Sequence, residues 1–391
     1  MDRTREPMIR LDNVSKRYDN GTVAVDGLDL AVPRGDLVTL VGPSGCGKTT
    51  ILKMVNRLIQ PTSGRIVIDG EDVTDVDQVQ LRRRIGYVIQ TAGLFPHRTI
   101  LENVVTVPWL LRWDKGRTRS RGLELLELVG LDPDTYAHRY PHQLSGGQQQ
   151  RVGVARALAA DPPVLLMDEP FGAVDPVVRE RLQDEFLRLQ REVRKTIVFV
   201  THDLDEAVRL GDRIAVFSQG GHLEQYDAPA TVLGEPATPF VADFVGSDRG
   251  LKRLSVTIIA ADDLAHPPVV HLDDPLAFAG EHLWASESQW AVVLDDRDDL
   301  HGWVPLSATS REGTVRDAAR RMEAWVPAGA SLKQAFSEML KHDAGWIAVL
   351  DGDRYLGVLT PATLHEALRR SIESDGRPTG ATVTVQSVSS A

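Results

Sequence analysis

The chain has 391 residues, enough for two or three domains that each bury their own hydrophobic core. Hydrophobic residues make up 42% and charged residues 25% of the sequence, a balance typical of a folded globular protein. The formal net charge of -11 argues against a nucleic-acid-binding protein, because the surface that contacts phosphates is usually basic.

The sequence favours a soluble intracellular protein. Charged side chains in Met1–Arg10 have no apolar stretch behind them, so no secretory signal is expected. The longest apolar runs, such as Val164–Met167, suit buried strands and are too short to cross a bilayer. Cys46 is the single cysteine, which excludes an internal disulfide and fits a reducing compartment. Any role at a membrane must therefore depend on a partner.

Residues up to about 235 alternate short β-rich runs with amphipathic helical stretches, and this predicts βαβ units around a mostly parallel sheet. Helices are expected over Lys48–Leu58, Pro176–Val193 and Asp203–Leu210. The strands expected to be buried are Leu37–Val41, Arg65–Ile68, Gly86–Ile89, Val164–Met167, Thr196–Thr201 and Arg213–Phe217.

Between Thr91 and Ala160 the strand signals disappear and helical patterns dominate, which predicts an inserted helical subdomain over about residues 91–160. Glu235-Pro-Ala-Thr-Pro239 then interrupts the alternation. We interpret residues 1–235 as one α/β domain and residues 236–255 as a linker.

Residues 256–370 contain an internal repeat, in which Trp290–Leu294 matches Trp346–Leu350. Five further residues match at the same offset: Val270, Leu276, Ala279, Leu300 and Pro305 pair with Val326, Leu332, Ala335, Leu356 and Pro361. The repeat predicts two copies of a small α/β unit that bury their faces against each other; chance similarity between amphipathic segments is the alternative. Residues 371–391 are rich in Ser, Thr and Gly and predict a disordered tail.

A glycine-rich loop between a predicted strand and a predicted helix is typical of a phosphate site. Its backbone N–H groups and the positive helix end would cradle a phosphate chain, with Lys48 reaching the β- and γ-phosphates and Thr49 ligating Mg²⁺. The residues of this loop are Gly42, Pro43, Ser44, Gly45, Cys46, Gly47, Lys48, Thr49 and Thr50.

The apolar run Val164–Met167 ends in two carboxylates. Successive side chains diverge at a strand end, so Asp168 can hold the metal while Glu169 faces the attacking water as general base. Such a pair alone is weak support for a site, but beside a phosphate loop it becomes strong support for hydrolysis of a bound phosphate chain.

Ser145, Gly146, Gly147 and Gln148 open another helix and form a second anion-binding helix start. One nucleotide has no obvious need of two cradles in one chain. Two chains arranged head-to-tail would use both, with each phosphate loop opposite the partner's serine-led helix.

These motifs, in this order, resemble the ABC-transporter ATPases over roughly the first 235 residues. The resemblance makes Gly42–Thr50 the Walker A motif, Leu144–Gln148 the signature and Val164–Asp168 the Walker B motif. It implies that the fold is an α/β P-loop ATPase, that the cofactors are ATP and Mg²⁺, and that Lys48 and Glu169 are catalytic.

The same resemblance assigns four further elements. Tyr18 corresponds to the aromatic residue that stacks on adenine, and Gln90 to the Q-loop glutamine that contacts the metal and senses the membrane subunit. That subunit is expected to dock on the segment after Gln90, Thr91–Asn103. Phe171–Asp175 corresponds to the D-loop, and His202 to the catalytic switch histidine that reads the γ-phosphate. Thr49, Gln90 and Asp168 are then the expected metal ligands.

Trp109–Asp114, Arg151–Ala157 and Phe244–Arg253 resemble the branch of bacterial importers for glycine betaine, carnitine, choline or proline. In that branch a tandem pair of CBS domains follows the ATPase domain. The resemblance implies a transmembrane permease subunit, a second ATPase chain that is either identical or different and, indirectly, an extracytoplasmic solute-binding protein as partners, and no nucleic acid. It places the protein at the cytoplasmic face of the membrane.

The repeat departs from CBS pairs that bind adenine nucleotides, which carry a glycine, then Ser or Thr, then an acid. The second copy keeps Gly357 and Thr360 but has Thr363 in place of the acid, and the first copy, Gly302–Ala308, keeps neither the hydroxyl nor the acid. AMP-type binding is therefore not expected. A cyclic dinucleotide, an anionic lipid or ionic strength stays open as the signal, beside a purely structural module.

Three alternative functions predict different sequence features. A non-transport ABC ATPase would usually carry two ATPase halves, zinc sites or long coiled coils. A sugar or anion importer subunit would carry a β-barrel after residue 255. A sensor with a vestigial ATPase would not need Lys48, Asp168, Glu169 and His202 intact.

Overall fold

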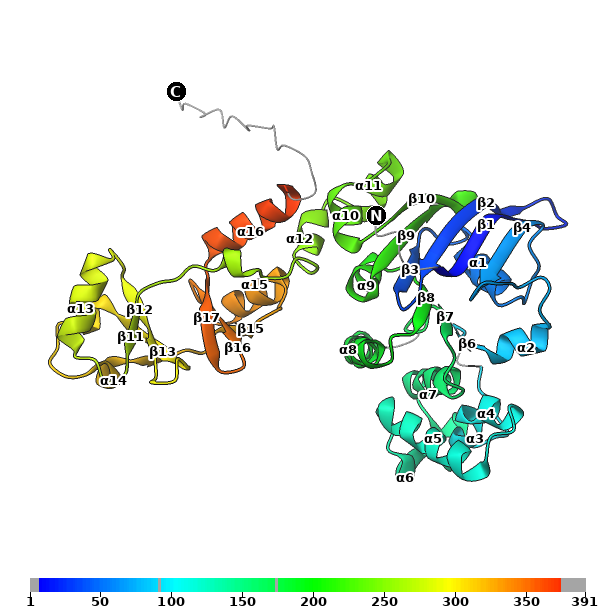
Figure 1. Ribbon diagram of the computed structural model, residues 1–391, viewed down its shortest axis with the longest axis horizontal. Helices are drawn as coiled ribbons and strands as arrows, with labels where there is room; N and C mark the ends of the chain where they lie inside the picture. Colours follow the sequence, from blue (N-terminus) through cyan, green and yellow to red (C-terminus); the bar gives the residue numbers. More distant parts are fainter. Residues whose placement is uncertain (1–6, 91–92, 173–174, 374–391) are drawn as a thin grey trace. The chain divides into compact units, whose positions relative to one another are not determined.

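The computed structural model describes residues 7–90, 93–172 and 175–373 (Figure 1). The chain divides into two compact units. The N-terminal unit comprises Met1–Val232 and Pro236–Gly246, and the C-terminal unit comprises Leu233–Glu235 and Ser247–Ala391. In the described residues no helix combines the length and the apolar character that a membrane crossing needs.

A six-stranded sheet with the order β10-β9-β3-β8-β7-β6 forms the centre of the N-terminal unit. All neighbouring pairs in it are parallel except β10 with β9. This confirms the predicted α/β class. Its strands are β3 (Leu37–Val41), β6 (Ile85–Val88), β7 (Val164–Asp168), β8 (Thr196–Val200), β9 (Arg213–Ser218) and β10 (His222–Asp227).

A second, antiparallel sheet has the order β2-β1-β4-β5. It corrects the assignment of Arg65–Ile68, which lies in this sheet and not among the parallel strands, because its partner is the distant strand β1. Strands β1 and β2 were not predicted, although Leu28, Leu30 and Val32 alternate with exposed residues as in a half-buried strand. The strands are β1 (Pro7–Arg17), β2 (Val23–Pro33), β4 (Ser63–Ile68) and β5 (Glu71–Asp72).

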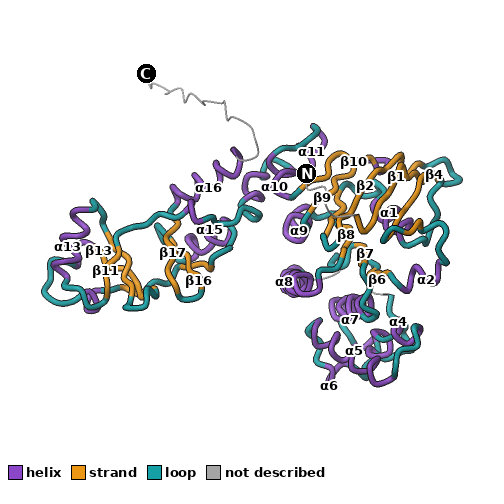
Figure 2. The backbone as a smooth tube through the Cα atoms, viewed as in Figure 1, coloured by secondary structure: helices purple, strands orange, loops and turns teal. Residues whose placement is uncertain are grey.

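Helices cover the parallel sheet and continue into the predicted helical subdomain, which consists of helices and loops from α3 to α7 (Figure 2). Helix α1 ends at Val55, before the predicted Leu58, because Arg57 adopts a positive φ of 47°. The helices are α1 (Lys48–Val55), α2 (Gln78–Arg83), α3 (Ile100–Val104), α4 (Thr106–Leu110), α5 (Lys115–Leu128), α6 (Pro133–Tyr136), η1 (Pro141–Gln143), α7 (Gly146–Leu158), α8 (Pro176–Val193), α9 (Leu204–Leu210), η2 (Gln219–Gly221), α10 (Pro229–Gly234) and α11 (Pro239–Val245).

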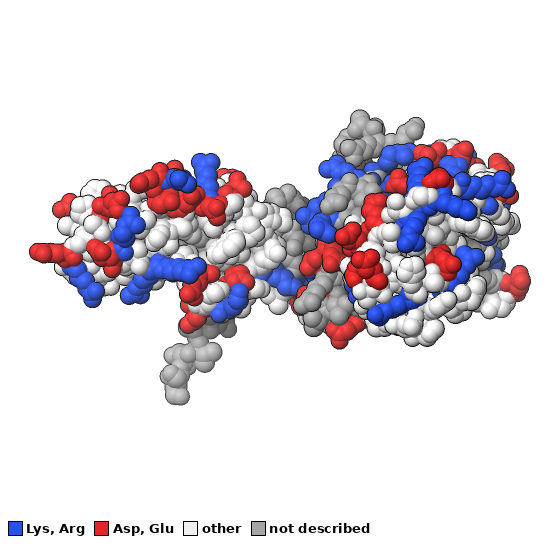
Figure 3. All heavy atoms as spheres, turned by 90° about the horizontal axis from the view of Figure 1, so that it is seen from below, with Lys and Arg blue, Asp and Glu red and all other residues white. Residues whose placement is uncertain are grey.

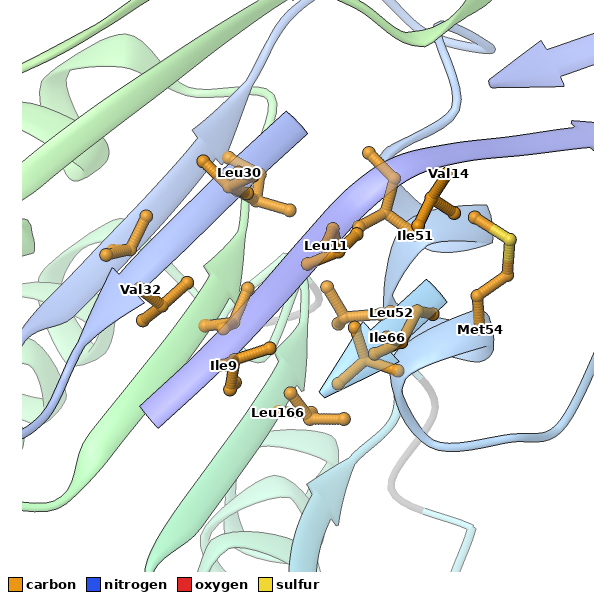
Figure 4. Close-up of a cluster of buried hydrophobic side chains, with 14 of the residues drawn as sticks. Ile9, Leu11, Val14, Leu30, Val32, Ile51, Leu52, Met54, Ile66 and Leu166 are labelled. Carbon is orange, nitrogen blue, oxygen red and sulfur yellow. The ribbon is translucent and has the colours of Figure 1, made fainter. Parts of the chain in front are cut away.

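The parallel strands bury both faces, and each face has its own core. Val38, Leu166 and Val200 point to the face covered by α1 and the antiparallel sheet (Figure 4 shows part of this cluster). Leu165 and Phe199, one residue along, point to the opposite face, which α7, α8 and the helical subdomain cover. Helices α1 and α7 therefore pack on opposite sides of one sheet.

The C-terminal unit contains the predicted repeat as two copies of one β-α-β-β arrangement. In each copy the first strand pairs in parallel with the second, which pairs antiparallel with the third. These open sheets differ from the β-barrel that the sugar or anion importer hypothesis requires. The elements are η3 (Ala261–Asp263), β11 (Val269–His271), α13 (Leu276–Ala285), β12 (Trp290–Leu294), β13 (Leu300–Pro305), η4 (Leu306–Ala308), α14 (Val315–Ala318), β14 (Arg320–Arg321), β15 (Trp325–Pro327), α15 (Leu332–Lys341), β16 (Ile347–Asp351), β17 (Arg354–Leu359) and α16 (Pro361–Glu373).

Equivalent residues of the two copies meet where the copies pack together. The rings of Trp290 and Trp346, matched in the sequence repeat, stack with centroids 4.0 Å apart and planes 2° apart. A small cluster of buried residues from both copies, Val292, Leu294 and Val358, adjoins them. The copies thus bury apolar surface against each other, as the repeat predicts.

The predicted linker and the predicted tail have boundaries that differ from those in the structure. The segment interpreted as a linker, residues 236–255, contains α11 and the short helix α12 (Arg249–Arg253). Helix α16 runs to Glu373, so the first residues of the predicted tail are helical. The rest of that tail, residues 374–391, lies outside the described residues. On the face seen in Figure 3, acidic and basic side chains are interspersed, so this face has no extended basic band.

Candidate nucleotide site

The glycine-rich loop connects β3 to α1 at the carboxyl end of the sheet. A side chain at Gly42 would overlap the carbonyl oxygen of Phe217 on β9, and one at Gly47 would overlap that of Ala24 on β2. Both positions also have positive φ values, 149° and 111°. Only glycine fits there, and the loop consequently packs tightly on its two neighbouring strands.

The Lys48 side chain folds back into this loop. Its Nζ atom donates to the carbonyl oxygens of Gly42, at 2.7 Å, and Pro43, at 3.0 Å. Cys46 is fully buried behind it, with Sγ 3.5 Å from Nζ. Ser44 and Gly45 form the exposed rim. The loop thus holds a positive charge at its centre, next to the first turn of α1, where an anion is favoured.

A hydroxyl and a carboxylate meet beside that charge. Thr49, in the first turn of α1, donates from Oγ1 to Oδ1 of Asp168 at 2.9 Å. Asp168 ends β7 and is only 7% exposed. Burial raises the pKa of this carboxyl, against the opposing effect of the Thr49 hydrogen bond and of nearby lysines. Hard oxygen donors of this kind suit Mg²⁺.

Two side chains converge on one oxygen of Glu169. Gln90 donates from Nε2 to Oε2 at 3.1 Å, and Nδ1 of His202 lies 3.3 Å from the same atom. Glu169 itself has a φ of 46°, unusual for a residue with a side chain, and its N–H donates to the carbonyl of Val200 at 3.0 Å. This backbone bond to β8 supports the uncommon conformation, which brings Glu169 and His202 together.

The predicted adenine residue lies at the edge of the same loop. Tyr18 directly follows β1, is 38% exposed, and has its hydroxyl 3.5 Å from Oγ1 of Thr50. The ammonium of Lys16 lies 5.3 Å from the centre of the tyrosine ring. An exposed ring beside the phosphate loop can stack on a nucleobase.

The serine-led start of α7 is exposed and fully capped. Ser145 accepts from the N–H of Gln148 at 3.3 Å, while the Gln148 side chain accepts from the N–H of Ser145 at 2.9 Å. Gln148 also donates to the Tyr136 hydroxyl at 3.0 Å. Gly146, exposed at the first position of the helix, leaves the helix end open to an anion.

The segment after Glu169 returns to the sheet through an aromatic cluster. Phe171 is buried against Phe186 of α8 and Phe199 of β8, and the N–H of Gly172 donates to the carbonyl of Glu169 at 3.1 Å. Residues 173 and 174 of the predicted D-loop lie outside the described residues.

An exposed aromatic surface on the helical subdomain was only partly predicted. Trp109 is 63% exposed and Phe95 40%, and the Arg98 guanidinium lies 6.0 Å and 5.0 Å from their ring centres. Asn103, fully buried, holds the loop between Phe95 and Thr99 through hydrogen bonds to both of these residues and to the Arg98 carbonyl. Phe95, Arg98 and Asn103 lie within the segment Thr91–Asn103 on which the membrane subunit is expected to dock, but none of them was singled out from the sequence. A large apolar residue inside an otherwise polar loop is the signal that could have indicated this surface.

Comparisons with known proteins agree with this geometry. The family model described as ABC transporter matches residues 25–172, and the one described as CBS domain matches residues 315–370. The glycine betaine/carnitine/choline transport ATP-binding protein OpuCA of Bacillus subtilis is 44% identical over 374 residues, covering 94% of this chain and 98% of that protein. The osmoprotectant import ATP-binding protein OsmV of Salmonella typhimurium is 46% identical, covering 90% of this chain and 94% of that protein.

Solved structures resemble the N-terminal unit. The ATP-binding cassette MJ0796, in a dimeric post-hydrolysis state bound to ADP and phosphate, is 38% identical with a TM-score of 0.52. It covers 57% of this chain, and the match includes 99% of that chain. The same cassette in another dimeric structure gives 39% identity and a TM-score of 0.53.

Proposed function

This chain belongs to the family of ATP-binding subunits of ABC transporters, and on that premise we propose that it energises the import of quaternary-amine osmoprotectants such as glycine betaine, carnitine or choline. It is an ATPase of the P-loop fold with a CBS module. The functions of its relatives support the solute class, since these proteins match this chain over most of its length.

The observation that carries the proposal is the convergence of Gln90 and His202 on Glu169, next to Lys48 and the pair Thr49–Asp168. Lys48 binds the β- and γ-phosphates, Glu169 orients and activates the attacking water, and His202 reports on the γ-phosphate. Thr49, Asp168 and Gln90 would hold Mg²⁺, which when bound neutralises charge on the β- and γ-phosphates.

The active form that we propose contains two copies of the chain. Helices α1 and α7 pack on opposite faces of the sheet, so the phosphate loop and the exposed Ser145 start do not face one nucleotide from within one chain. A second copy arranged head-to-tail would supply its serine-led helix to the phosphate loop of the first. The dimeric nucleotide-bound state of the similar cassette supports this arrangement.

The permease subunit would dock at the cytoplasmic membrane face onto the aromatic surface of Phe95, Arg98 and Trp109. Exposed aromatic side chains beside an arginine are typical of protein interfaces. Residues 91 and 92, which begin the predicted docking segment Thr91–Asn103, lie outside the described residues. A movement of Gln90 on nucleotide binding would pass along this segment to the permease.

The CBS module would regulate the ATPase through a nucleotide, lipid or ionic signal. The hydroxyl of Thr360 accepts from the N–H of Thr363 at 3.2 Å, and the hydroxyl of Thr363 accepts from the N–H of Thr360 at 2.9 Å. Thr363, which stands where nucleotide-binding pairs have an acid, thus completes the cap of α16. Because both hydroxyls accept hydrogen bonds from backbone N–H groups at the start of α16, this geometry supports a regulator other than AMP.

Reconstitution in lipid vesicles with the permease subunit tests the proposal. ATP turnover should rise when glycine betaine and the extracytoplasmic solute-binding protein are present, and glycine betaine should accumulate in the uptake direction. Stimulation by maltose or sulfate but by none of the quaternary amines would refute the solute class while leaving the ATPase assignment intact.

A further inference from the structure

The two residues that meet at the catalytic end of the sheet, Glu169 and His202, belong to two chain segments that then separate. One runs from Glu169 through Phe171 into α8, and the other from His202 into α9. Their side chains are in contact at 3.3 Å, and that distance depends on how the two segments are held. In the part of the chain that the structure describes, a second, buried connection joins α8 to α9.

The second connection is a hydrogen bond between buried side chains. Gln183 of α8 donates from Nε2 to Oε1 of Glu206 on α9 at 2.9 Å, and the two residues are 5% and 7% exposed. Burial raises the pKa of the Glu206 carboxyl, and the Thr201 and Gln183 side chains that it faces oppose that rise. The N–H of Glu206 donates to Oδ1 of Asp203, the residue after His202, at 3.2 Å. Thr201, 1% exposed, directly precedes His202.

Thr201 in turn fixes the backbone on both sides of the histidine. Its N–H donates to the Leu40 carbonyl of β3 at 3.2 Å, and its Oγ1 accepts from the N–H of Asp203 at 3.0 Å. His202 therefore sits between a residue anchored to the sheet and a residue oriented by the Thr201 hydroxyl. The Glu206 carboxylate lies between Thr201 and α8, where it accepts the hydrogen bond from Gln183.

We propose that Glu206 is a positioning residue for ATP hydrolysis, which through Thr201 and Gln183 sets the placement of His202 relative to Glu169. This rests on the catalytic roles of His202 and Glu169 in the proposed function. The aromatic contacts of Phe171, Phe186 and Phe199 pack α8 against the sheet, and the buried hydrogen bond adds a directional constraint to that packing. Burying a carboxylate is costly, so its presence here indicates a need for that constraint.

The test measures steady-state ATP turnover of the full chain. Glu206→Ala should lower kcat by about tenfold or more with the KM for ATP nearly unchanged, since a misplacement near 1 Å can cost up to a hundredfold. Glu206→Gln should restore most of the turnover, because its amide can accept from Gln183 and donate to Thr201. Gln183→Ala removes the same hydrogen bond from the α8 side and should lower kcat by a similar factor. The double variant should have about the same kcat as Glu206→Ala alone.

Asp184→Ala is the matched control. Its carboxylate pairs with Arg209 at 2.7 Å on the exposed part of the same contact between α8 and α9, and this variant should turn over ATP like the parent. A thermal melt of each variant checks that the measured protein is folded at the assay temperature.

Single-turnover hydrolysis followed over hours separates this inference from the proposed function. In a His202→Ala background, adding Glu206→Ala should change the residual rate less than about twofold, because the residue it positions is gone. An additional full loss in that background, or a Glu206→Ala variant that hydrolyses ATP at the parent's rate, would overturn the inference alone. A His202→Ala variant with normal turnover would overturn the switch role and, with it, the inference.

Discussion

At the residue scale, the site is organised around a single carboxylate oxygen. Oε2 of Glu169 lies within 3.1 Å of the Gln90 amide and 3.3 Å of His202. Both neighbours are polar groups that a water molecule or a γ-phosphate can displace, so the contact is suited to a residue that exchanges partners when ATP binds. The backbone bond from Glu169 to Val200 fixes its main chain while its side chain exchanges them.

Glu169→Gln should bind ATP but turn it over about a hundredfold or more slowly, because the amide keeps the side-chain shape and loses the base. Phosphate release and equilibrium binding of a fluorescent ATP analogue measure the two properties. Glu180→Gln, at an exposed glutamate of α8, is the matched control and should leave both unchanged. Normal phosphate release by Glu169→Gln would contradict the assigned role.

The neighbouring Asp168 should make the stability of the folded chain depend on pH. Burial raises the pKa of its carboxyl above the ordinary value of 3.8, so the folded chain holds this proton to a higher pH than the unfolded chain does. Between the two pKa values the folded state binds more protons, and the contribution of Asp168 to stability decreases as pH rises through that window. Above the higher pKa, Asp168 is ionised in both states, and its ionised carboxylate destabilises the folded state to the full extent.

Asp168→Asn removes this effect while an oxygen remains to accept from Thr49. Without nucleotide, the variant should therefore melt at a higher temperature than the parent at pH 7, and the difference should shrink as pH falls toward 4. Melting curves across that pH range measure it, with the exposed Asp184→Asn as control. A parent more stable than Asp168→Asn at pH 7 would show that burial does not dominate the energetics of this carboxyl.

At the scale of elements, two helices carry the same cap in different settings. Helix α7 starts with Ser145 and Gln148, and α15 starts with Ser331 and Gln334, each pair exchanging reciprocal hydrogen bonds. The first lies in the N-terminal unit and is exposed, whereas the second is a buried cap in the C-terminal unit. A comparison between them separates helix stability from nucleotide chemistry.

Ser145→Ala and Ser331→Ala should each cost about 1 kcal/mol of stability in their own unit, the usual effect of losing an N-cap. Only Ser145→Ala should also lower ATP turnover, because only that hydroxyl would face the nucleotide of the partner chain. Denaturant unfolding and phosphate release measure the two effects. Equal turnover losses in both variants would argue against the proposed use of the α7 start.

The aromatic surface of the helical subdomain makes a separate prediction. Trp109→Ala should weaken association with the permease subunit by about tenfold or more, as expected for an exposed tryptophan at the centre of an interface. Trp284→Ala is the matched control, since Trp284 is 75% exposed on α13 of the C-terminal unit. Co-purification from detergent at a series of concentrations measures the effect, and equal losses for both variants would place the docking surface elsewhere.

At the scale of the whole molecule, the chain contains separate hydrophobic cores. The clusters on the two faces of the parallel sheet involve residues up to Phe217, and those of the C-terminal unit begin at Leu254. Among the described residues, each unit therefore has hydrophobic clusters of its own, which supply the apolar burial that independent folding requires.

A chain ending at Gly246 should therefore fold and hydrolyse ATP without the C-terminal unit. Calorimetry should show one transition for this shortened chain and an additional one for the full chain. A shortened chain that aggregates or lacks turnover, or a full chain that unfolds in one indivisible transition, would show that the units depend on each other for stability.

The sequence alone determined the local parts of this protein. The phosphate loop, the Asp168–Glu169 pair and the Ser145 helix start are short motifs whose glycines, caps and charges specify their own backbone, and the structure has each at the predicted strand end or helix start. The repeat could also be predicted from the sequence, because Trp290 and Trp346 occupy matching positions in its two copies, and their rings stack in the structure. Each of these signals lies within a few residues of the feature that it predicts.

Only the tertiary structure decided which distant segments meet. Sequence patterns do not specify that Arg65–Ile68 pairs with β1, that α1 and α7 cover opposite faces, or that Gln183 reaches Glu206. Those contacts depend on nonlocal packing. Many partners are chemically possible for a given strand or polar side chain, and packing of the complete core selects one of them. Asn103 and Glu206 look like ordinary surface residues in the sequence, and their burial alone reveals what they hold in place.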